Sequence, residues 1–156
     1  MRFIRVVCAT TLALAASFGS TAASAEVPDL LKAQTGRVTY VDFWASWCAP
    51  CAQSFPWLNE MQAKYGARGL RIVGVGVDTQ TAKGDRFLQQ HPAQIAIVRD
   101  PQGALAQHYA VEGMPYAVLL DAQGHVLHRH TGFRVTEVAQ YERAIEDALS
   151  TQGSHP

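Results

Sequence analysis

Cys48 and Cys51 are the residues whose types and spacing most directly indicate chemistry in this sequence. Two thiols separated by two residues can close a small disulfide and reopen it by thiol–disulfide exchange. The apolar, aromatic and β-prone residues 41–47 precede the pair, and helix-forming residues follow it. A strand is therefore predicted to deliver Cys48 to a helix N-terminus. Because the first N–H groups of a helix lack intrahelical partners, they would stabilise a thiolate there, and Cys48 is the expected nucleophile.

Cys51 follows one helical turn later on the same face and is the expected resolving thiol, which would attack Cys48 in a mixed disulfide. Pro50 stiffens the intervening loop and, in the first turn of a helix, removes no needed hydrogen bond. A structural disulfide that encloses two residues would constrain the unfolded chain very little, and a zinc site would need four ligands. Catalysis is therefore the favoured interpretation of the pair.

The beginning of the chain has the pattern of a secretory signal peptide. A basic start precedes an apolar run at residues 6–18 and a small-residue cleavage pattern that ends at Ala25. Cleavage after Ala25 would remove Cys8 and leave the two motif cysteines as the only thiols of an exported protein. The alternative is an uncleaved N-terminus that anchors the protein to the inner membrane.

The chain has 156 residues, of which 48% are hydrophobic, and a formal net charge of +0. This length and apolar content suffice for one compact domain, and the balanced charge gives no indication of nucleic-acid binding. We expect a signal peptide at 1–25, a domain at 26–151 and a flexible C-terminal tail at 152–156.

Strands are predicted at 37–44, 70–77, 94–98, 116–120 and 126–131. Helices are predicted at 49–65, 79–91, 103–109 and 136–149, after a short amphipathic segment at 27–34. Asp78 or Thr79 is expected to cap the second helix and Thr136 the last, while Pro56 should kink the first. The strand at 70–77 is apolar on both faces and is expected in the centre of the sheet. The alternation of strands and helices predicts an α/β sandwich with a mixed sheet.

In this arrangement the chain resembles the thioredoxin superfamily and, within it, the exported TlpA-like thiol-disulfide oxidoreductases. Residues 41–48 resemble the family's active-site strand and motif, Pro56 falls at its helix kink, and residues 113–115 resemble its cis-proline loop. Residues 79–98 resemble the helix–strand insertion typical of the TlpA group. The resemblance implies a thioredoxin-like fold, with a mixed central sheet flanked by helices and a TlpA-type helix–strand insertion.

The resemblance assigns Asp42, six residues before Cys48, to a buried acid that exchanges a proton with Cys51. Burial would raise the pKa of this carboxyl toward the range in which a resolving thiol loses its proton. The alternative is a solvated aspartate at the end of a strand. Many TlpA-like proteins have asparagine at this position and an acid within the insertion instead, which leaves a contribution of Asp78 open.

Four further residues are expected to support the cysteines. The resemblance implies that the loop containing Pro115 lies against the sulfurs and offers backbone groups to an extended substrate segment. An ordinary trans proline is the alternative. Met114 would shield the sulfurs, whereas Trp47 and Trp44 would pack over the site or belong to the core alone.

Three histidines near the predicted 126–131 strand raise the question of a metal site. A strand would place His128 and His130 on one side, with His125 in the turn on the other, which provides too few ligands for one ion. His91 and His108 are expected on helices as partly buried residues. We therefore expect neither a metal nor another cofactor.

These features indicate a periplasmic thiol-disulfide oxidoreductase that cycles Cys48 and Cys51 between dithiol and disulfide while reducing other proteins. Ala49 and Pro50 provide no histidine that would strongly stabilise the thiolate, so a reductant is favoured over a DsbA-like oxidant. The resemblance implies a membrane electron donor of the DsbD or CcdA kind. Candidate substrates are the haem-site cysteines of apocytochrome c, copper-site thiols or a broader set of disulfide-containing proteins. We expect a monomer that binds no nucleic acid.

A copper metallochaperone is the alternative from another functional class. It would use Cys48 and Cys51 as soft ligands together with a histidine. Sco-type copper proteins space their cysteines one residue wider, which disfavours this alternative.

Overall fold

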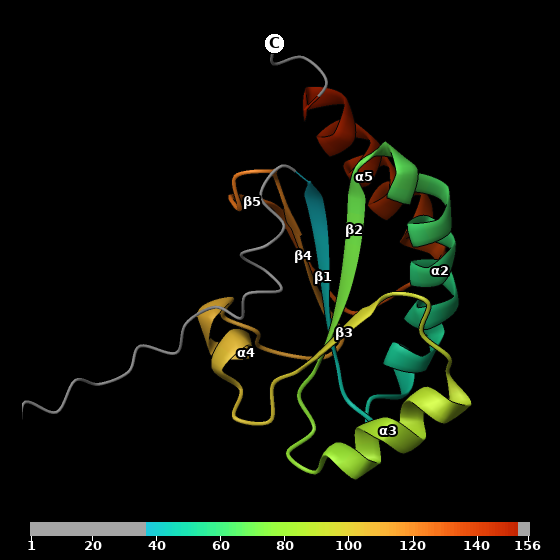
Figure 1. Ribbon diagram of the computed structural model, residues 1–156, viewed down its shortest axis with the longest axis vertical. Helices are drawn as coiled ribbons and strands as arrows, with labels where there is room; N and C mark the ends of the chain where they lie inside the picture. The colour runs from blue at the N-terminus through green and yellow to red at the C-terminus, as the bar shows by residue number, and fades with distance from the viewer. Residues whose placement is uncertain (1–36, 153–156) are drawn as a thin grey trace, which may run out of the picture.

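The computed structural model of the protein describes residues 37–152 (Figure 1). The expected signal peptide at 1–25, the amphipathic segment at 27–34 and residues 153–156 of the expected tail lie outside the described residues. Among the residues described, no helix is long and apolar enough to cross a membrane.

A five-stranded sheet forms the centre of the fold, with the strand order β3-β2-β1-β4-β5. Its strands are β1 (Val38–Trp44), β2 (Leu70–Gly76), β3 (Ala96–Arg99), β4 (Tyr116–Leu120) and β5 (Val126–Thr131). β1 pairs in parallel with β2 and antiparallel with β4, β2 pairs in parallel with β3, and β4 pairs antiparallel with β5. The sheet is therefore mixed, which confirms the predicted fold class.

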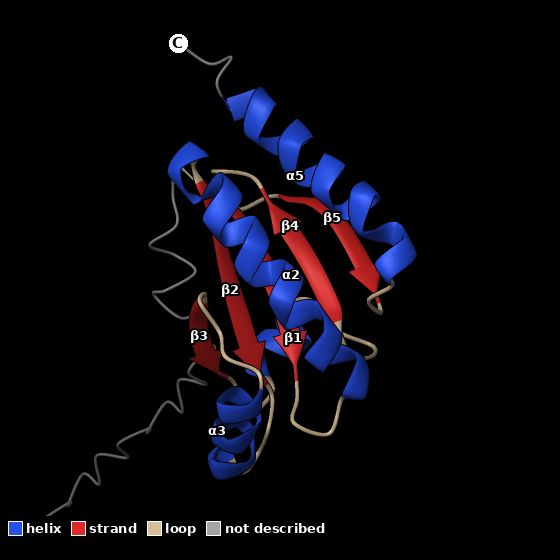
Figure 2. Ribbon diagram, turned by 90° about the vertical axis from the view of Figure 1, so that its right-hand side faces the viewer, coloured by secondary structure: helices blue, strands red, loops and turns tan. Residues whose placement is uncertain are grey.

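Helices cover both faces of the sheet. They are α2 (Ala49–Tyr65), α3 (Thr81–Gln90), α4 (Ala104–His108) and α5 (Val138–Gln152), with 3₁₀ turns η1 (Gly66–Arg68) and η2 (Val135–Glu137). Helices α2 and α5 lie on one face, and α4 lies on the other (Figures 1 and 2). Helix α3 and strand β3 form the additional helix and strand that the resemblance implies.

Strand β1 is buried along its whole length and contributes side chains to both layers. Tyr40 and Trp44 join the core cluster beneath α2 and α5, whereas Val41 and Phe43 join the cluster on the opposite face. Because successive side chains of a strand point to opposite faces, Asp42 lies on the same face as Tyr40 and Trp44. β1 thus places a carboxyl in the core layer of α2.

The order of elements matches the prediction, with differences at some ends. β3 begins two residues later than expected, at Ala96, and Pro56 lies inside α2 without interrupting it. β2 is an interior strand, but β1 takes the middle position of the sheet in its place. A short strand such as β3 has few ladder bonds, so its ends depend on tertiary contacts that the sequence pattern does not show.

The expected caps of two helices are wrong. Helix α3 begins at Thr81, and Gln80 occupies its N-cap position without a capping side-chain hydrogen bond. Thr136 lies within the 3₁₀ turn η2, which runs directly into α5. Asp78 does not cap α3 because its carboxylate binds Ser46, a residue of the loop after β1.

Candidate active site

Three loops meet at one edge of the sheet. Trp44 at the end of β1 pairs with Gly76 at the end of the parallel strand β2, and Phe43 pairs with Tyr116 at the start of the antiparallel strand β4. The loop after β1, the loop after β2 and the loop before β4 therefore lie side by side. Since β2 and β4 flank β1 on opposite sides, β1 ends at the kind of switch point where α/β folds place their sites.

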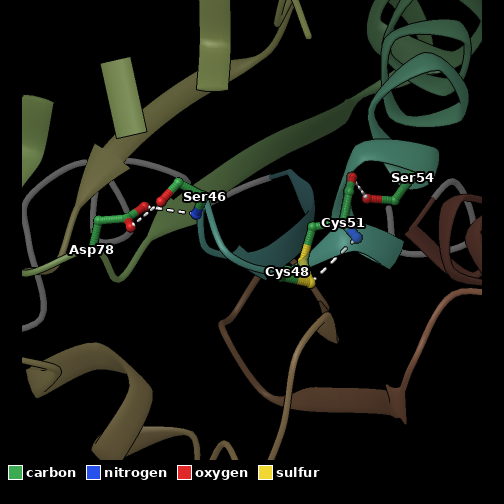
Figure 3. The surroundings of a disulfide bond; sticks show 5 residues. All are labelled: Ser46, Cys48, Cys51, Ser54 and Asp78. Atoms are coloured by element: carbon green, nitrogen blue, oxygen red, sulfur yellow. Dashed lines mark hydrogen bonds between the residues drawn. A yellow bond between two sulfur atoms is a disulfide. The ribbon is translucent and has the colours of Figure 1, made fainter. Parts of the chain in front are cut away.

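Cys48 and Cys51 form a disulfide at the N-terminus of α2 (Figure 3). Cys48 is the N-cap residue in an extended conformation, and its Sγ accepts a hydrogen bond from the Cys51 N–H at 3.2 Å. The Cys48 N–H donates to the Ala45 carbonyl at 3.1 Å, which closes a turn before the helix. The Cys48 sulfur therefore lies at the free N–H groups of the helix, where a thiolate is stabilised.

The two cysteines differ in exposure. Cys48 is 5% exposed and Cys51 is 0% exposed. A substrate sulfur must approach from outside, so Cys48 is the better placed of the two to form the first bond with it. Ala49 and Pro50 lie exposed between the cysteines in the first helical turn.

Asp42 is buried in β1 between Gly74 of β2 and Ala117 of β4, neither of which has a polar side chain. Its Oδ2 has no hydrogen-bond partner among the described residues. Burial raises the pKa of Asp42 from 3.8 to about 8, because a charged carboxylate is poorly solvated there. The carboxyl is therefore mainly protonated at pH 7. The alternative of a solvated aspartate at a strand end is wrong.

Ser54 is a buried residue of the site that the sequence reasoning does not single out. Its hydroxyl donates to the Cys51 carbonyl at 2.9 Å, within one turn of α2 (Figure 3). This bond holds the backbone of Cys51 from the buried side of the helix. A hydroxyl residue three positions after Cys51 is the signal that could have identified it.

Asp78, in the loop after β2, contacts the residues that precede Cys48. Its Oδ2 accepts a hydrogen bond from the Ser46 N–H at 2.9 Å, and its Oδ1 accepts one from the Ser46 hydroxyl at 2.6 Å (Figure 3). Ser46 is the second residue that the sequence reasoning misses. Its place two positions before Cys48 is the only signal that the sequence offers for it.

The Met114–Pro115 peptide bond is cis, as the resemblance implies. Pro115 is buried, and its carbonyl accepts a hydrogen bond from the Gly132 N–H at 2.7 Å. Met114 is partly buried and packs against both core clusters. The loop before β4 is thus tied to the end of β5, at the edge of the sheet where β1 delivers Cys48.

The two tryptophans of the motif have different environments. Trp47, next to Cys48, is 70% exposed. Trp44 is fully buried, and its ring stacks on Phe87 of α3 with centroids 4.9 Å apart. Trp44 therefore belongs to the core, whereas Trp47 presents an apolar ring to solvent beside the disulfide.

The histidines have separate environments. His130 Nε2 lies 2.7 Å from the hydroxyl of Tyr40, and His125 Nδ1 lies 3.0 Å from the carboxylate of Asp121. In the part of the chain that the structure describes, no group of three or more His, Cys, Asp or Glu side chains could hold a metal ion. His91 is partly buried at the end of α3, but His108 is exposed, contrary to expectation.

Curated proteins similar to this chain are thiol-disulfide proteins. The DsbE homolog of Paracoccus denitrificans, a thiol:disulfide interchange protein, is 34% identical over 130 residues, which cover 81% of this chain and 69% of that protein. The thiol-disulfide oxidoreductase ResA of Bacillus thuringiensis is 28% identical over 107 residues, or 69% of this chain. The chain spans 62% of the length of that ResA protein.

Solved structures and a family profile agree with these relatives. A protein from Chlorobium tepidum, assigned as the thiol:disulfide interchange protein DsbE, is 48% identical with a TM-score of 0.75, over 76% of this chain and 84% of that one. StoA from Bacillus subtilis, at 22% identity and a TM-score of 0.62, shares the fold over 70% of this chain and 83% of its own. The Redoxin profile matches residues 13–145. The resemblance to TlpA-like proteins of the thioredoxin superfamily is thereby confirmed, and the chain belongs to the Redoxin family.

Proposed function

We propose that this protein is a thiol-disulfide oxidoreductase that reduces disulfides of other proteins through Cys48 and Cys51. One observation carries the proposal: Cys48, the more exposed of the two cysteines, lies at the start of α2, and the fully buried Cys51 is its partner in the disulfide. The names of the similar DsbE and ResA proteins support the same reaction.

The exchange takes two steps. In the reduced protein, the Cys48 thiolate attacks one sulfur of a substrate disulfide, and the other substrate sulfur leaves as a thiolate that takes up a proton. Cys51 then loses its proton and attacks Cys48, which releases the second substrate sulfur and closes the Cys48–Cys51 disulfide. Two electrons pass to the substrate, and the protein is left in the disulfide state that the structure holds.

Asp42 is the proposed acceptor of the Cys51 proton. β1 holds its carboxyl on the face covered by α2, the helix that carries Cys51. With a pKa of about 8, this carboxyl is ionised in about a tenth of the molecules at pH 7. A base whose pKa lies near the working pH combines availability with driving force, so the shift supports this role.

The residues around Cys48 are proposed to receive the substrate. Trp47 offers an exposed ring beside the attacking sulfur, and Met114 contributes an apolar side chain at the same edge of the sheet. The loop at Pro115 would pair its backbone with an extended substrate segment. Pro50 restricts the turn between the cysteines.

The residues between the cysteines support the proposed reducing direction. The side chains of Ala49 and Pro50 add no hydrogen-bond donor or charge to the Cys48 thiolate, so the dithiol form is less favoured than in an oxidant. The signal-like N-terminus supports export to the periplasm, with an uncleaved membrane anchor as the alternative. A reductant there needs a membrane electron donor, which we propose to be of the DsbD or CcdA kind.

The substrate is proposed to be a protein disulfide. Apocytochrome c haem-site cysteines and copper-site thiols are the two narrow candidates, and a broader set of exported proteins is the third. Each would present two cysteines joined as a disulfide, and an extended segment that carries them would suit the edge formed by Trp47 and the loop at Pro115.

The test is the equilibrium reduction potential of the purified mature protein against glutathione and dithiothreitol. We expect a value nearer to the roughly −270 mV of thioredoxin than to the roughly −120 mV of DsbA. A potential above about −160 mV would overturn the reducing direction in favour of an oxidant. Failure of the Cys48–Cys51 pair to exchange with either reagent would overturn the enzymatic proposal itself.

A further inference from the structure

Asp78 is a buried carboxylate near the disulfide that the exchange steps do not use. It is 6% exposed and lies two residues after the end of β2. Both of its oxygens accept hydrogen bonds from one residue, Ser46, through the backbone N–H and the side-chain hydroxyl (Figure 3). Two bonds to Ser46 fix both the orientation of Ser46 and its distance from Asp78. Hydrogen bonds to a carboxylate are stronger than those to a neutral acceptor.

Ser46 lies in the loop that delivers Cys48 to the helix. Val77 donates its N–H to the Trp44 carbonyl at 3.0 Å, and Cys48 donates its N–H to the Ala45 carbonyl at 3.1 Å. Asp78 adds two contacts between these points, at the residue midway between Trp44 and Cys48. The turn from β1 into α2 is therefore held from the side of β2 at Trp44 and Ser46, and closed by its own hydrogen bond at Cys48.

The insertion packs directly against Asp78. A Cβ atom added at Gly84 of α3 would lie 3.3 Å from Asp78 Oδ2 and would collide with Nη1 of Arg99 in β3. The Arg99 guanidinium lies 5.5 Å from the centre of the Trp44 ring and pairs with Asp85 of α3. Helix α3 can approach the carboxylate this closely because position 84 has no side chain.

We propose that Asp78 is a positioning residue that acts through Ser46 to hold Cys48 at the N-terminus of α2, so that the helix–strand insertion supports the reactivity of the attacking thiol. The inference rests on the proposed function, because it assigns Cys48 the first step of the exchange. Asp78 itself touches neither the sulfurs nor the substrate in this mechanism.

Removing the carboxylate has two effects of opposite sign on Cys48. Loss of a nearby negative charge favours the thiolate and lowers the pKa of Cys48. Release of Ser46 allows Cys48 to leave the helix N-terminus, which raises that pKa. The sign of the change therefore separates a positioning role from an electrostatic one.

The experiment measures the rate at which iodoacetamide alkylates Cys48 as a function of pH, in the reduced protein. Asp78→Ala is expected to raise the apparent pKa of Cys48 and to slow alkylation at pH 7 roughly threefold, the size of a lost helix-terminus interaction. Asp78→Asn is expected to leave the pKa unchanged or lower. Its amide oxygen can accept from the Ser46 N–H and its NH₂ group can donate to the Ser46 hydroxyl, while the charge is absent.

Asp100→Ala is the matched control. Asp100 is 5% exposed, also follows a strand, and accepts a hydrogen bond from the Ala106 N–H at 3.0 Å, at the start of α4 rather than α2. We expect Asp100→Ala to leave the Cys48 pKa unchanged, even if the free energy of unfolding falls. An equal rise of the pKa in both variants would mean general loosening of the fold and would overturn the proposal.

Ser46→Ala removes only the hydroxyl contact with Asp78. This variant replaces Asp78→Ala in the experiment if Asp78→Ala does not fold. Its Cys48 pKa should rise in the same direction, by less. An unchanged or lowered Cys48 pKa in whichever of these two variants folds would overturn the positioning role. Alkylation of Cys48 needs no protein substrate, so the measured Cys48 pKa tests the positioning role independently of enzymatic activity. Failure of the wild-type protein to reduce insulin disulfides would count against the proposed function alone.

Discussion

The Nε2 atom of His130 in β5 accepts a hydrogen bond from the hydroxyl of Tyr40 in β1, over 2.7 Å. The Gly132 carbonyl, 3.0 Å from His130 Nδ1, can only accept, so Nδ1 carries the hydrogen and Nε2 is the acceptor. Gly132 in turn donates its N–H to the Pro115 carbonyl. The His130 ring stacks on Tyr141 of α5, with centroids 4.1 Å apart. His130 therefore connects the middle strand, the last helix and the loop before β4.

The neutral form of His130 predicts a loss of stability in mild acid. Burial lowers the pKa of His130 below 6.5, so below this pH the unfolded chain binds a proton that the folded protein does not. The free energy of unfolding should therefore fall as the pH drops from 6.5 toward the lowered value. Urea denaturation between pH 5 and pH 8 measures it. His130→Gln should be less stable at pH 7 and should lose part of this pH dependence.

The control for His130 is His108→Gln, because His108 is exposed at the end of α4. This variant should keep the pH dependence of the wild type. If His130→Gln and His108→Gln gave the same slope, the acid sensitivity would have to come from other groups.

Asp42→Asn should slow the release of the mixed disulfide more than its formation, because only the second step needs Cys51 as a thiolate. General-base assistance is typically worth roughly 10² to 10⁴ in rate, and a good leaving thiolate at Cys48 would reduce this effect. Stopped-flow reduction of a model disulfide between pH 6 and pH 9 separates the two steps. Unchanged resolution throughout this range would leave Asp42 as a structural residue of the strand.

The same Asp42→Asn variant should be as stable as the wild type or more stable at pH 7. The folded-state pKa of about 8 lies above the unfolded value of 3.8, so the folded protein binds the additional proton between these values. The wild-type free energy of unfolding therefore decreases as the pH rises from about 4 to about 8. The amide keeps the shape without an ionisable proton, so the gain from Asp42→Asn should grow over this range. Denaturation at pH 5 and pH 8 tests the sign.

Cys51→Ser should accumulate a mixed disulfide with a protein substrate, because the attacking Cys48 remains and the resolving thiol is gone. Cys48→Ser should form none, since Cys51 is fully buried. Non-reducing electrophoresis after mixing with a disulfide-containing protein distinguishes the two. Faster alkylation of Cys51 than of Cys48 in the reduced wild type would reverse the assigned roles.

Gly84→Ala should destabilise the protein, although alanine is normally the better helix residue by about 1 kcal/mol. The new Cβ would lie 3.3 Å from Asp78 Oδ2 and collide with the Arg99 guanidinium, and overpacking of this kind typically costs about 1 to 3 kcal/mol. Ala82→Gly, at an exposed position of the same helix, measures the propensity difference alone. A stability gain from Gly84→Ala would show that α3 can move away without loss.

The local part of the site could be predicted because it depends on neighbours in the chain. The strand before Cys48, the helix after it and the N-cap place of the first sulfur all follow from residues 41–65. The contact of Ser46 with Asp78 spans 32 residues and that of Tyr40 with His130 spans 90. Both depend on how β1 is aligned with its neighbours, and periodicity does not determine that alignment.

The capping errors have the same origin. Asp78 is a residue type that caps helices, and it stands just before α3, so the local rule favours that role. The rule considers only nearby backbone donors. In the folded protein, the loop after β1 presents two donors from Ser46, and the carboxylate bonds to them. Asp78 therefore contacts the loop that leads into α2, and it caps neither α3 nor α2.

Strand β1 is hydrogen-bonded along both edges, to β2 and to β4, and all of its residues are buried. Backbone amides in such a strand exchange with deuterium mainly when the whole domain unfolds, so local fluctuation of β1 does not bring Asp42 to bulk water. Water has to approach the carboxyl from the side of α2, whose first turn carries the disulfide. We therefore expect the rate at which Asp42 exchanges its proton with solvent to depend on opening of that turn, and to differ between the dithiol and disulfide forms.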